Sequence, residues 1–175
     1  MIQQACRLFA QRQEPFSVNL SIEDINDNEV VQKIIHTITT TNTAHQITFE
    51  ILESEGIENY NSVANFIAQA QSLGARIAID DFGTGYSNFE HILKLNIDFI
   101  KIDGSLITGI ANHLRHRIIV ETISNFAQKI GAKTIAEFVS TEETYTTLKS
   151  IGIDYAQGYY LGKPAKLSSI PETIF

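Results

Sequence analysis

A short motif that occurs twice in this sequence restricts the fold class more than any other feature. LGARIAID at residues 73–80 and IGAKTIAE at 130–137 share one order: an apolar residue, Gly, Ala, a basic residue, a short apolar stretch and an acid six residues after the glycine. IGIDYAQ at 151–157 is a looser third copy that ends in Gln157, five residues after its glycine. Apolar residues at helical spacing precede each glycine, as expected where a helix ends through a left-handed residue. The repeated unit is therefore helix, glycine, strand and polar residue.

The same alternation extends along the rest of the chain. Six short apolar stretches are predicted strands, at residues 16–20, 47–51, 76–80, 98–102, 133–137 and 155–160. Helical periodicity occurs around 30–38, 63–73, 89–93, 119–130 and 145–151, and Ser140 and Glu143 are spaced as a capping box for the last of these helices. Short apolar strands separated by helices indicate an α/β fold with a parallel sheet buried on both faces. We expect a single domain over 1–175, because no low-complexity linker divides the chain.

A polar side chain lies at or near the end of every predicted strand. In parallel α/β folds, functional sites lie beyond the carboxyl ends of the strands, which all meet at one rim. These rim residues are, in order, Asn19, Glu50, Asp80 with Asp81, Lys101, Glu137 and Gln157. Asn, Asp and Glu oxygens suit a hard cation such as Mg²⁺ or Mn²⁺, and a bound cation would offset the repulsion between the two adjacent aspartates. The alternative is that each residue only solvates the rim or caps the next helix.

Lys101 and the glycine-rich turn have two interpretations each. Lys101 ends an apolar run, FIKID, and could orient a nucleophilic water or offset charge on a phosphoryl oxygen. It could also extend to solvent or pair with Asp103. GTG at 83–85 is either a plain tight turn or part of a loop that holds Asp81 in place.

Charge, cysteine and histidine content exclude several classes of function. With 13 Lys+Arg against 20 Asp+Glu, the net charge of −7 argues against binding a nucleic-acid polymer, because that affinity comes largely from cationic side chains. Cys6 is the single cysteine, so neither an intrachain disulfide nor a thiolate metal site is expected, and we predict that it is buried on an N-terminal helix. His113 and His116 form an i, i+3 pair without a third ligand nearby in sequence and are predicted surface residues. Without a secretory signal or an apolar run long enough for a membrane helix, we expect no membrane contact and a cytoplasmic location.

Six segments together resemble successive motifs of the EAL domain, a family of bacterial cyclic di-GMP phosphodiesterases. They are SVNLS (17–21), FEILES (49–54), IDDFGTGYS (79–87), DFIKID (98–103), TIAEFVST (134–141) and QGYYLGKP (157–164). DDFGTGYS followed by KID, AEF and QGY is a highly specific order, and the resemblance covers about residues 5–165. It implies an incomplete TIM-barrel-like (β/α) barrel, in which the chain carries the C-terminal three quarters of the family domain and about six of its eight β/α units.

The resemblance also implies a role for each rim residue. The matching metal ligands are Asn19, Glu50 and Asp80, with Asp81 serving a second metal, while Lys101 and Glu137 match the pair that holds and activates the attacking water. The substrate-binding or loop-supporting candidates are Gln157, which matches a glutamine that lines the site, Glu53, which matches a glutamate that steadies the loop from Asp81 to Ser87, and Asp103. The family hydrolyses cyclic di-GMP to linear pGpG with two Mg²⁺ or Mn²⁺ ions. It commonly forms a homodimer through the region of that loop and the following helix, and an upstream regulatory domain would be consistent with it.

The chain departs from the family pattern mainly in its first part. The tripeptide Glu-Ala-Leu, whose glutamate is a metal ligand in the family, occurs nowhere in the sequence. Leu52 stands where the family usually has Thr, and Ser140 where it usually has a second glutamate. We therefore expect either a truncated domain or a degenerate gene, and three hypotheses stay open: a phosphodiesterase, an inactive cyclic di-GMP sensor or protein-interaction module, and a barrel fragment without a ligand.

Overall fold

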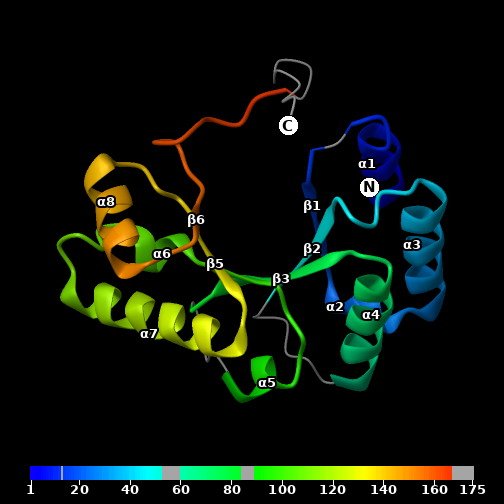
Figure 1. Cartoon of the computed structure of the whole chain (residues 1–175), viewed down its shortest axis with the longest axis horizontal. Coiled ribbons are helices and arrows are strands. Elements are labelled where there is room, and N and C mark those ends of the chain that lie inside the picture. The colour runs from blue at the N-terminus through cyan, green and yellow to red at the C-terminus, as the bar shows by residue number, and fades with distance from the viewer. Residues whose placement is uncertain (13, 53–59, 84–88, 167–175) are drawn as a thin grey trace.

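The computed structural model describes residues 1–12, 14–52, 60–83 and 89–166 of the chain (Figure 1). At its centre is a six-stranded parallel sheet with the strand order β1-β2-β3-β4-β5-β6. The strands are β1 (Phe16–Leu20), β2 (Ile47–Leu52), β3 (Arg76–Phe82), β4 (Phe99–Ile102), β5 (Lys133–Ala136) and β6 (Tyr155–Ala156). At least one helix connects each pair of successive strands, as parallel pairing requires. The predicted α/β fold is confirmed.

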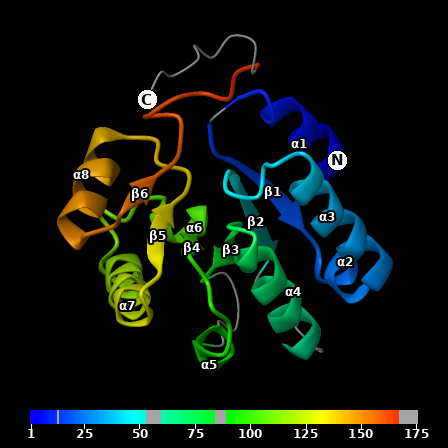
Figure 2. The ribbon, with the colours of Figure 1, turned by 45° about the vertical axis from the view of Figure 1, so that its right-hand side comes forward.

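The helices lie mainly on the outer side of the curved sheet (Figure 2). They are α1 (Ile2–Phe9), α2 (Ile22–Asn26), α3 (Asn28–Thr40), α4 (Tyr60–Ser72), α5 (Phe89–Leu93), α6 (Gly104–Ile107), α7 (Leu114–Ile130) and α8 (Glu142–Ile151). Within the described residues, β1 and β6 each pair with a neighbour on one side, so the sheet is an open, TIM-barrel-like arc. No helix among these residues is both long and apolar enough to cross a lipid bilayer.

The helix ends follow the predicted chemistry with one exception. Gly131 and Gly152 end α7 and α8 with φ of 81° and 89°, the left-handed conformation that glycine adopts at low cost. The predicted capping box of Ser140 and Glu143 is wrong, because Thr141 is the N-cap of α8 and its hydroxyl accepts a hydrogen bond from Thr144 N at 3.1 Å.

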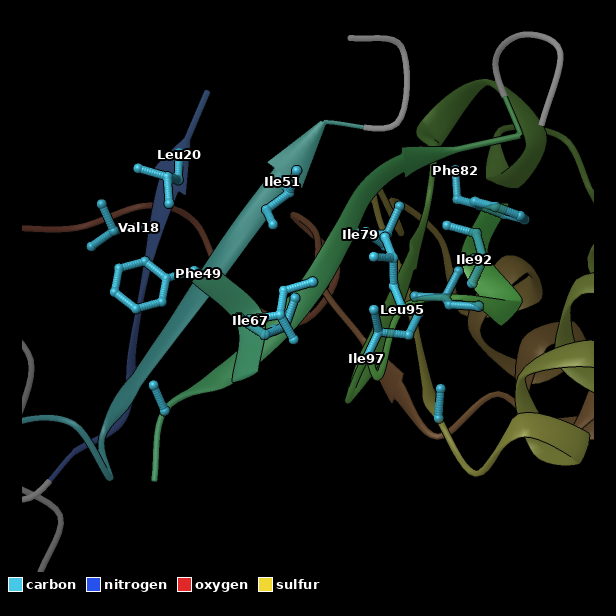
Figure 3. Packing of buried hydrophobic residues seen from close by; sticks show 14 of the residues in the cluster. Val18, Leu20, Phe49, Ile51, Ile67, Ile79, Phe82, Ile92, Leu95 and Ile97 are labelled. Atoms are coloured by element: carbon cyan, nitrogen blue, oxygen red, sulfur yellow. The ribbon is translucent and has the colours of Figure 1, made fainter. Parts of the chain in front are cut away.

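The layer between the sheet and the outer helices is an apolar core. Phe49 of β2 and Phe66 of α4 are both buried, and their rings pack edge to face with centroids 5.4 Å apart. Figure 3 shows part of this cluster, with Ile67 of α4 and Ile79 of β3 among its labelled members. Burial of each such side chain contributes roughly 1.5–3 kcal/mol, so this layer fixes the positions of the strands that carry the rim residues.

Two aspartates fasten the amino-terminal ends of the strands, opposite the rim. Asp98 Oδ2 accepts a hydrogen bond from Ile77 N at 2.8 Å, and Asp154 Oδ2 accepts one from Thr134 N at 2.9 Å. Lys133 Nζ adds an ion pair to Asp154 at 2.7 Å. Partial burial alone would raise the pKa of Asp154, but these hydrogen bonds outweigh it and lower that pKa below its ordinary value. The two contacts are equivalent, and each aspartate lies directly before a strand.

The predictions for Cys6 and His113 agree with the structure, whereas His116 is less exposed than predicted. Cys6 is buried on α1. At the start of α7, His113 is exposed and His116 is half-buried, with ring centroids 5.2 Å apart. In the described part of the chain, no third metal-binding side chain joins these two histidines.

Candidate functional site

Lys101 lies at the centre of a cluster of carboxylates at the carboxyl-end rim. Its ammonium group donates to Asp80 Oδ1 at 2.7 Å and to Glu50 Oε2 at 2.9 Å, and it forms an ion pair with Glu137 Oε1 at 2.9 Å. The lysine is 5% exposed, and Asp80 and Glu137 are each 8% exposed. A buried cation is tolerated here because three negative partners surround it.

The strand register explains why these four side chains meet. Glu50 on β2 is level with the residue two positions before Asp80 on β3, and Lys101 on β4 is level with the residue two positions before Glu137 at the end of β5. Residues two apart on a strand face the same side of the sheet. Four adjacent strands therefore deliver one polar side chain each to the same place.

Asp81 joins the cluster through an irregularity in β3. Successive strand residues normally face opposite sides of a sheet, so adjacent aspartates should point apart. The register with β4 shifts between Ile79 and Phe82, and Asp81 has a φ of 54°, in the left-handed region. Its N–H donates to Asp80 Oδ1 at 3.0 Å. Bulges of this kind re-aim side chains near active sites, and here the bulge lets both carboxylates reach the same site.

The charges of the cluster shift the protonation of its members. Burial alone would lower the pKa of Lys101, but its bonds to Asp80, Glu50 and Glu137 outweigh burial and raise that pKa well above the ordinary value, so the lysine stays charged. Burial raises the pKa of Glu137, and Lys101 only partly offsets this. Burial and the neighbouring Asp80 likewise raise the pKa of Asp81. The single positive charge of Lys101 does not neutralise all the carboxylates of the cluster, so a bound cation would be stabilised there.

Three of the carboxylates are close enough to share a cation. Asp80, Asp81 and Glu137 each offer an oxygen, and these oxygens all lie within 4.8 Å of one another. Hard divalent cations prefer such an all-oxygen set. Asn19 on β1 is level with Glu50 in the β1–β2 register, one strand further along the rim.

The residues predicted to bind substrate or support the loop, Asp103, Gln157 and Glu53, do not all lie in the cluster. Asp103 caps α6, since its carboxylate accepts a hydrogen bond from Ser105 N at 2.8 Å. The two alternatives for Lys101, extension to solvent or pairing with Asp103, do not occur. Gln157 follows β6, is exposed and borders a cavity that Glu137 also borders. Glu53 lies outside the described residues.

A cavity of about 860 Å³ opens beside Glu137. The residues that line it are Glu137, Phe138, Ser140, Gln157, Gly158, Tyr159, Gly162, Lys163, Pro164 and Ala165. Phe138 and Tyr159 had not been predicted as site residues, because an aromatic residue next to a strand end usually belongs to the core. The signal in the sequence was the position of Phe138 directly after Glu137.

Comparison with known proteins identifies one family. A family model described as the EAL domain matches residues 1–164. Cyclic di-GMP phosphodiesterase PdeF of Escherichia coli strain K12 is 40% identical over 124 residues, which cover 71% of this chain and 17% of that protein. Probable cyclic di-GMP phosphodiesterase PdeA of the same organism is 36% identical over 154 residues, covering 87% of this chain and 21% of that protein. The chain thus spans about a fifth of the length of these curated relatives.

Solved structures show the same fold. The PaMucR phosphodiesterase in complex with c-di-GMP has a TM-score of 0.86 and 26% identity, with 95% of this chain and 70% of that chain covered. The EAL domain of DcpA from Mycobacterium smegmatis also has a TM-score of 0.86, with 27% identity and coverage of 93% of this chain and 77% of that one.

Proposed function

The chain belongs to the EAL domain family, and on this basis we propose that its carboxyl-end rim is the active site of a metal-dependent phosphodiesterase that hydrolyses cyclic di-GMP to linear pGpG. We also propose that residues 1–175 form one EAL-type domain, corresponding to the C-terminal three quarters of the family barrel. The observation that carries the proposal is the cluster itself: Lys101 on β4 is bonded to three carboxylates, which lie on β2, on β3 and directly after β5. A cluster of buried carboxylates costs stability unless a further cation offsets it.

The donor set fits hard divalent cations. In this proposal Glu50, Asp80 and Asp81 hold the ions together with Asn19, and Mg²⁺ or Mn²⁺ suits these oxygen ligands. When bound, two such ions would lower the pKa of a water and withdraw charge from the phosphoryl oxygens. This explains how an acidic rim can accept an anionic substrate.

In the proposed hydrolysis, Glu137 acts as the general base and Lys101 stabilises negative charge. Glu137 takes a proton from the attacking water, and its raised pKa makes it a stronger base than an ordinary glutamate. The new P–O bond forms as the bond from phosphorus to the leaving sugar oxygen breaks, and that oxygen takes up a proton. Lys101 holds Glu137 in place and offsets the negative charge that develops on the phosphoryl group.

A second candidate function is binding of cyclic di-GMP without hydrolysis, as a sensor or interaction module. The position of the Lys101 ammonium group favours it, because this group bonds Glu50, Asp80 and Glu137 directly and so occupies part of the space between the proposed metal ligands. From the family resemblance we also propose a homodimer through the region of α5, where Leu93 is 61% exposed.

Conversion of cyclic di-GMP to pGpG in the presence of Mn²⁺, with Glu137→Gln measured beside the wild type, tests the proposal. We expect the variant to lose about 10²-fold or more of the turnover, because it keeps the shape of the side chain but not the base. Glu142→Gln, at an exposed position on α8, is the matched control and should keep full activity. Binding by the wild type without any turnover would instead support the sensor.

A further inference from the structure

Phe138 combines two unfavourable features that the proposed reaction does not explain. Its φ of 54° lies in the left-handed region, where bulky residues are rare. The residue is 69% exposed, although phenylalanine is among the residues most often buried. Strained residues of this kind persist only where the surrounding structure enforces them, and they cluster at ligand sites.

Hydrogen bonds on both sides enforce the backbone conformation of Phe138. The N–H of Glu137 donates to Ile102 O on β4 at 3.2 Å, whereas the N–H of Val139 donates to Gln157 O, just beyond β6, at 3.0 Å. The chain therefore changes from pairing with one neighbour to pairing with the other across the single residue Phe138. These bonds use backbone atoms alone, and glycine would adopt the same φ without strain. The phenyl ring is not needed for this turn.

The ring of Phe138 is supported on one side and open on another. A methyl group on Gly104, the first residue of α6, would lie 2.4 Å from Phe138 Cδ2 and 2.7 Å from Cγ, so the ring rests directly against that glycine. The ring also lines the 860 Å³ cavity that Glu137 and Gln157 border. Tyr159, which is 68% exposed, lines the same cavity.

We propose that Phe138 is a substrate-contacting residue whose ring stacks on a purine base of the dinucleotide, with Tyr159 as the second aromatic wall of the cavity. This inference rests on the proposed function, because it assigns the base-binding part of the same site. Aromatic rings bind any base through its flat face, and this contact carries no charge. It therefore adds affinity beside a cluster of carboxylates that repels the phosphates. The glycine beneath the ring fixes its orientation before the substrate arrives, which reduces the entropy lost on binding.

Removing the ring should weaken substrate binding without lowering the stability of the protein, and this combination distinguishes a binding role from a structural one. Phe138→Gly removes the backbone strain, so the melting temperature should stay the same or rise. Loss of one stacking contact should raise KM for cyclic di-GMP about 10-fold or more, with a much smaller change in kcat. Phe138→Tyr, which keeps an aromatic ring, should have the KM of the wild type.

Gly104→Ala, which displaces the ring, should raise KM as Phe138→Gly does. Leu114→Ala, which removes an exposed apolar side chain of α7, is the control and should leave KM unchanged.

Binding measured calorimetrically with Ca²⁺ alongside turnover with Mn²⁺ separates this inference from the proposed function. If Phe138→Gly and the wild type both hydrolyse cyclic di-GMP with the same KM, the stacking role of Phe138 is refuted, whereas the proposed phosphodiesterase activity is supported. Binding that weakens in Phe138→Gly, without turnover by any variant, would refute the phosphodiesterase and support the stacking role. A wild-type chain that neither binds nor hydrolyses cyclic di-GMP would overturn both.

Discussion

Replacing Lys101 by methionine tests whether the lysine holds the carboxylate cluster together. Methionine keeps the length of the side chain but removes the charge that Glu50, Asp80 and Glu137 share. Each hydrogen bond to a charged group contributes about 1.5–3 kcal/mol, and the cost of burying the ammonium group offsets part of the sum of three. Breaking a buried ion pair from one side costs about 3–5 kcal/mol, and we expect Lys101→Met to lower the free energy of unfolding by about this amount at pH 7.

The pH dependence gives the sign of the effect. Burial already raises the pKa of Glu137, and in Lys101→Met this carboxylate loses the cation that lowers its pKa, so its folded pKa lies further above the unfolded value of about 4. A carboxylate with a raised folded pKa destabilises the protein at high pH, and the penalty disappears as the pH falls through that pKa. The stability deficit of the variant should therefore be smaller at pH 5 than at pH 7. Mn²⁺ should also reduce the deficit, because it supplies positive charge to the same oxygens.

Urea unfolding at pH 7 and pH 5, with and without Mn²⁺, measures these differences. Lys133→Met is the matched control, since Lys133 pairs with Asp154 and its side chain is 59% exposed. This control should leave the stability almost unchanged, as expected for a surface ion pair. A deficit in Lys101→Met no larger than that of Lys133→Met, or one that is equal at the two pH values, would refute the reasoning.

Two further predictions concern the framework that positions the site. Asp154→Asn should lower stability by about 1 kcal/mol at pH 7, because it removes the negative charge that pairs with Lys133 and strengthens the hydrogen bonds from Thr134. The folded pKa of Asp154 is lowered, so this stabilisation is present above about pH 4 and is lost as the pH falls through the folded pKa; thermal melts should show the difference vanishing there. Gly158→Ala should cost about 1–3 kcal/mol, because a methyl group there would lie 2.3 Å from the backbone N and O of Val139. Gly162→Ala, with no atom within 4 Å of the added methyl, is its control, and equal melting temperatures for these two variants would contradict the clash.

Much of the fold was predictable because its signals are local. The apolar stretches and helical periodicity placed five strands to within two residues at either end, from β1 through β5, and the main helices between them. The predicted strand 155–160 ends at Ala156, because the chain beyond it folds back and Tyr160 N bonds to Val139 O. The short helices α2 and α6 were not predicted, since an element of four or five residues spans little more than one turn and its periodicity is weak; the five-residue helix α5 was predicted at 89–93.

The N-cap of α8 shows the limit of local patterns. Ser140 and Thr141 are both good capping residues, and each has a polar residue three positions later. Only the observed backbone shows that Thr141 makes the bond to Thr144 N. Adjacent candidates of similar propensity cannot be ranked without the path of the chain around them.

The sequence by itself determined the alternation of helices and strands, the polar residue near each strand end and the resemblance to one family, because periodicity and residue type are properties of neighbours along the chain. Only the tertiary structure decided which side chains meet. Lys101 pairs with carboxylates from other parts of the sheet rather than with Asp103, two residues away, because the register of the parallel sheet brings those side chains to one face at the rim, while Asp103 caps α6. Likewise, Asp81 and Phe138 adopt left-handed conformations because hydrogen bonds and register shifts between neighbouring strands impose them, and no local preference of either sequence segment encodes those contacts.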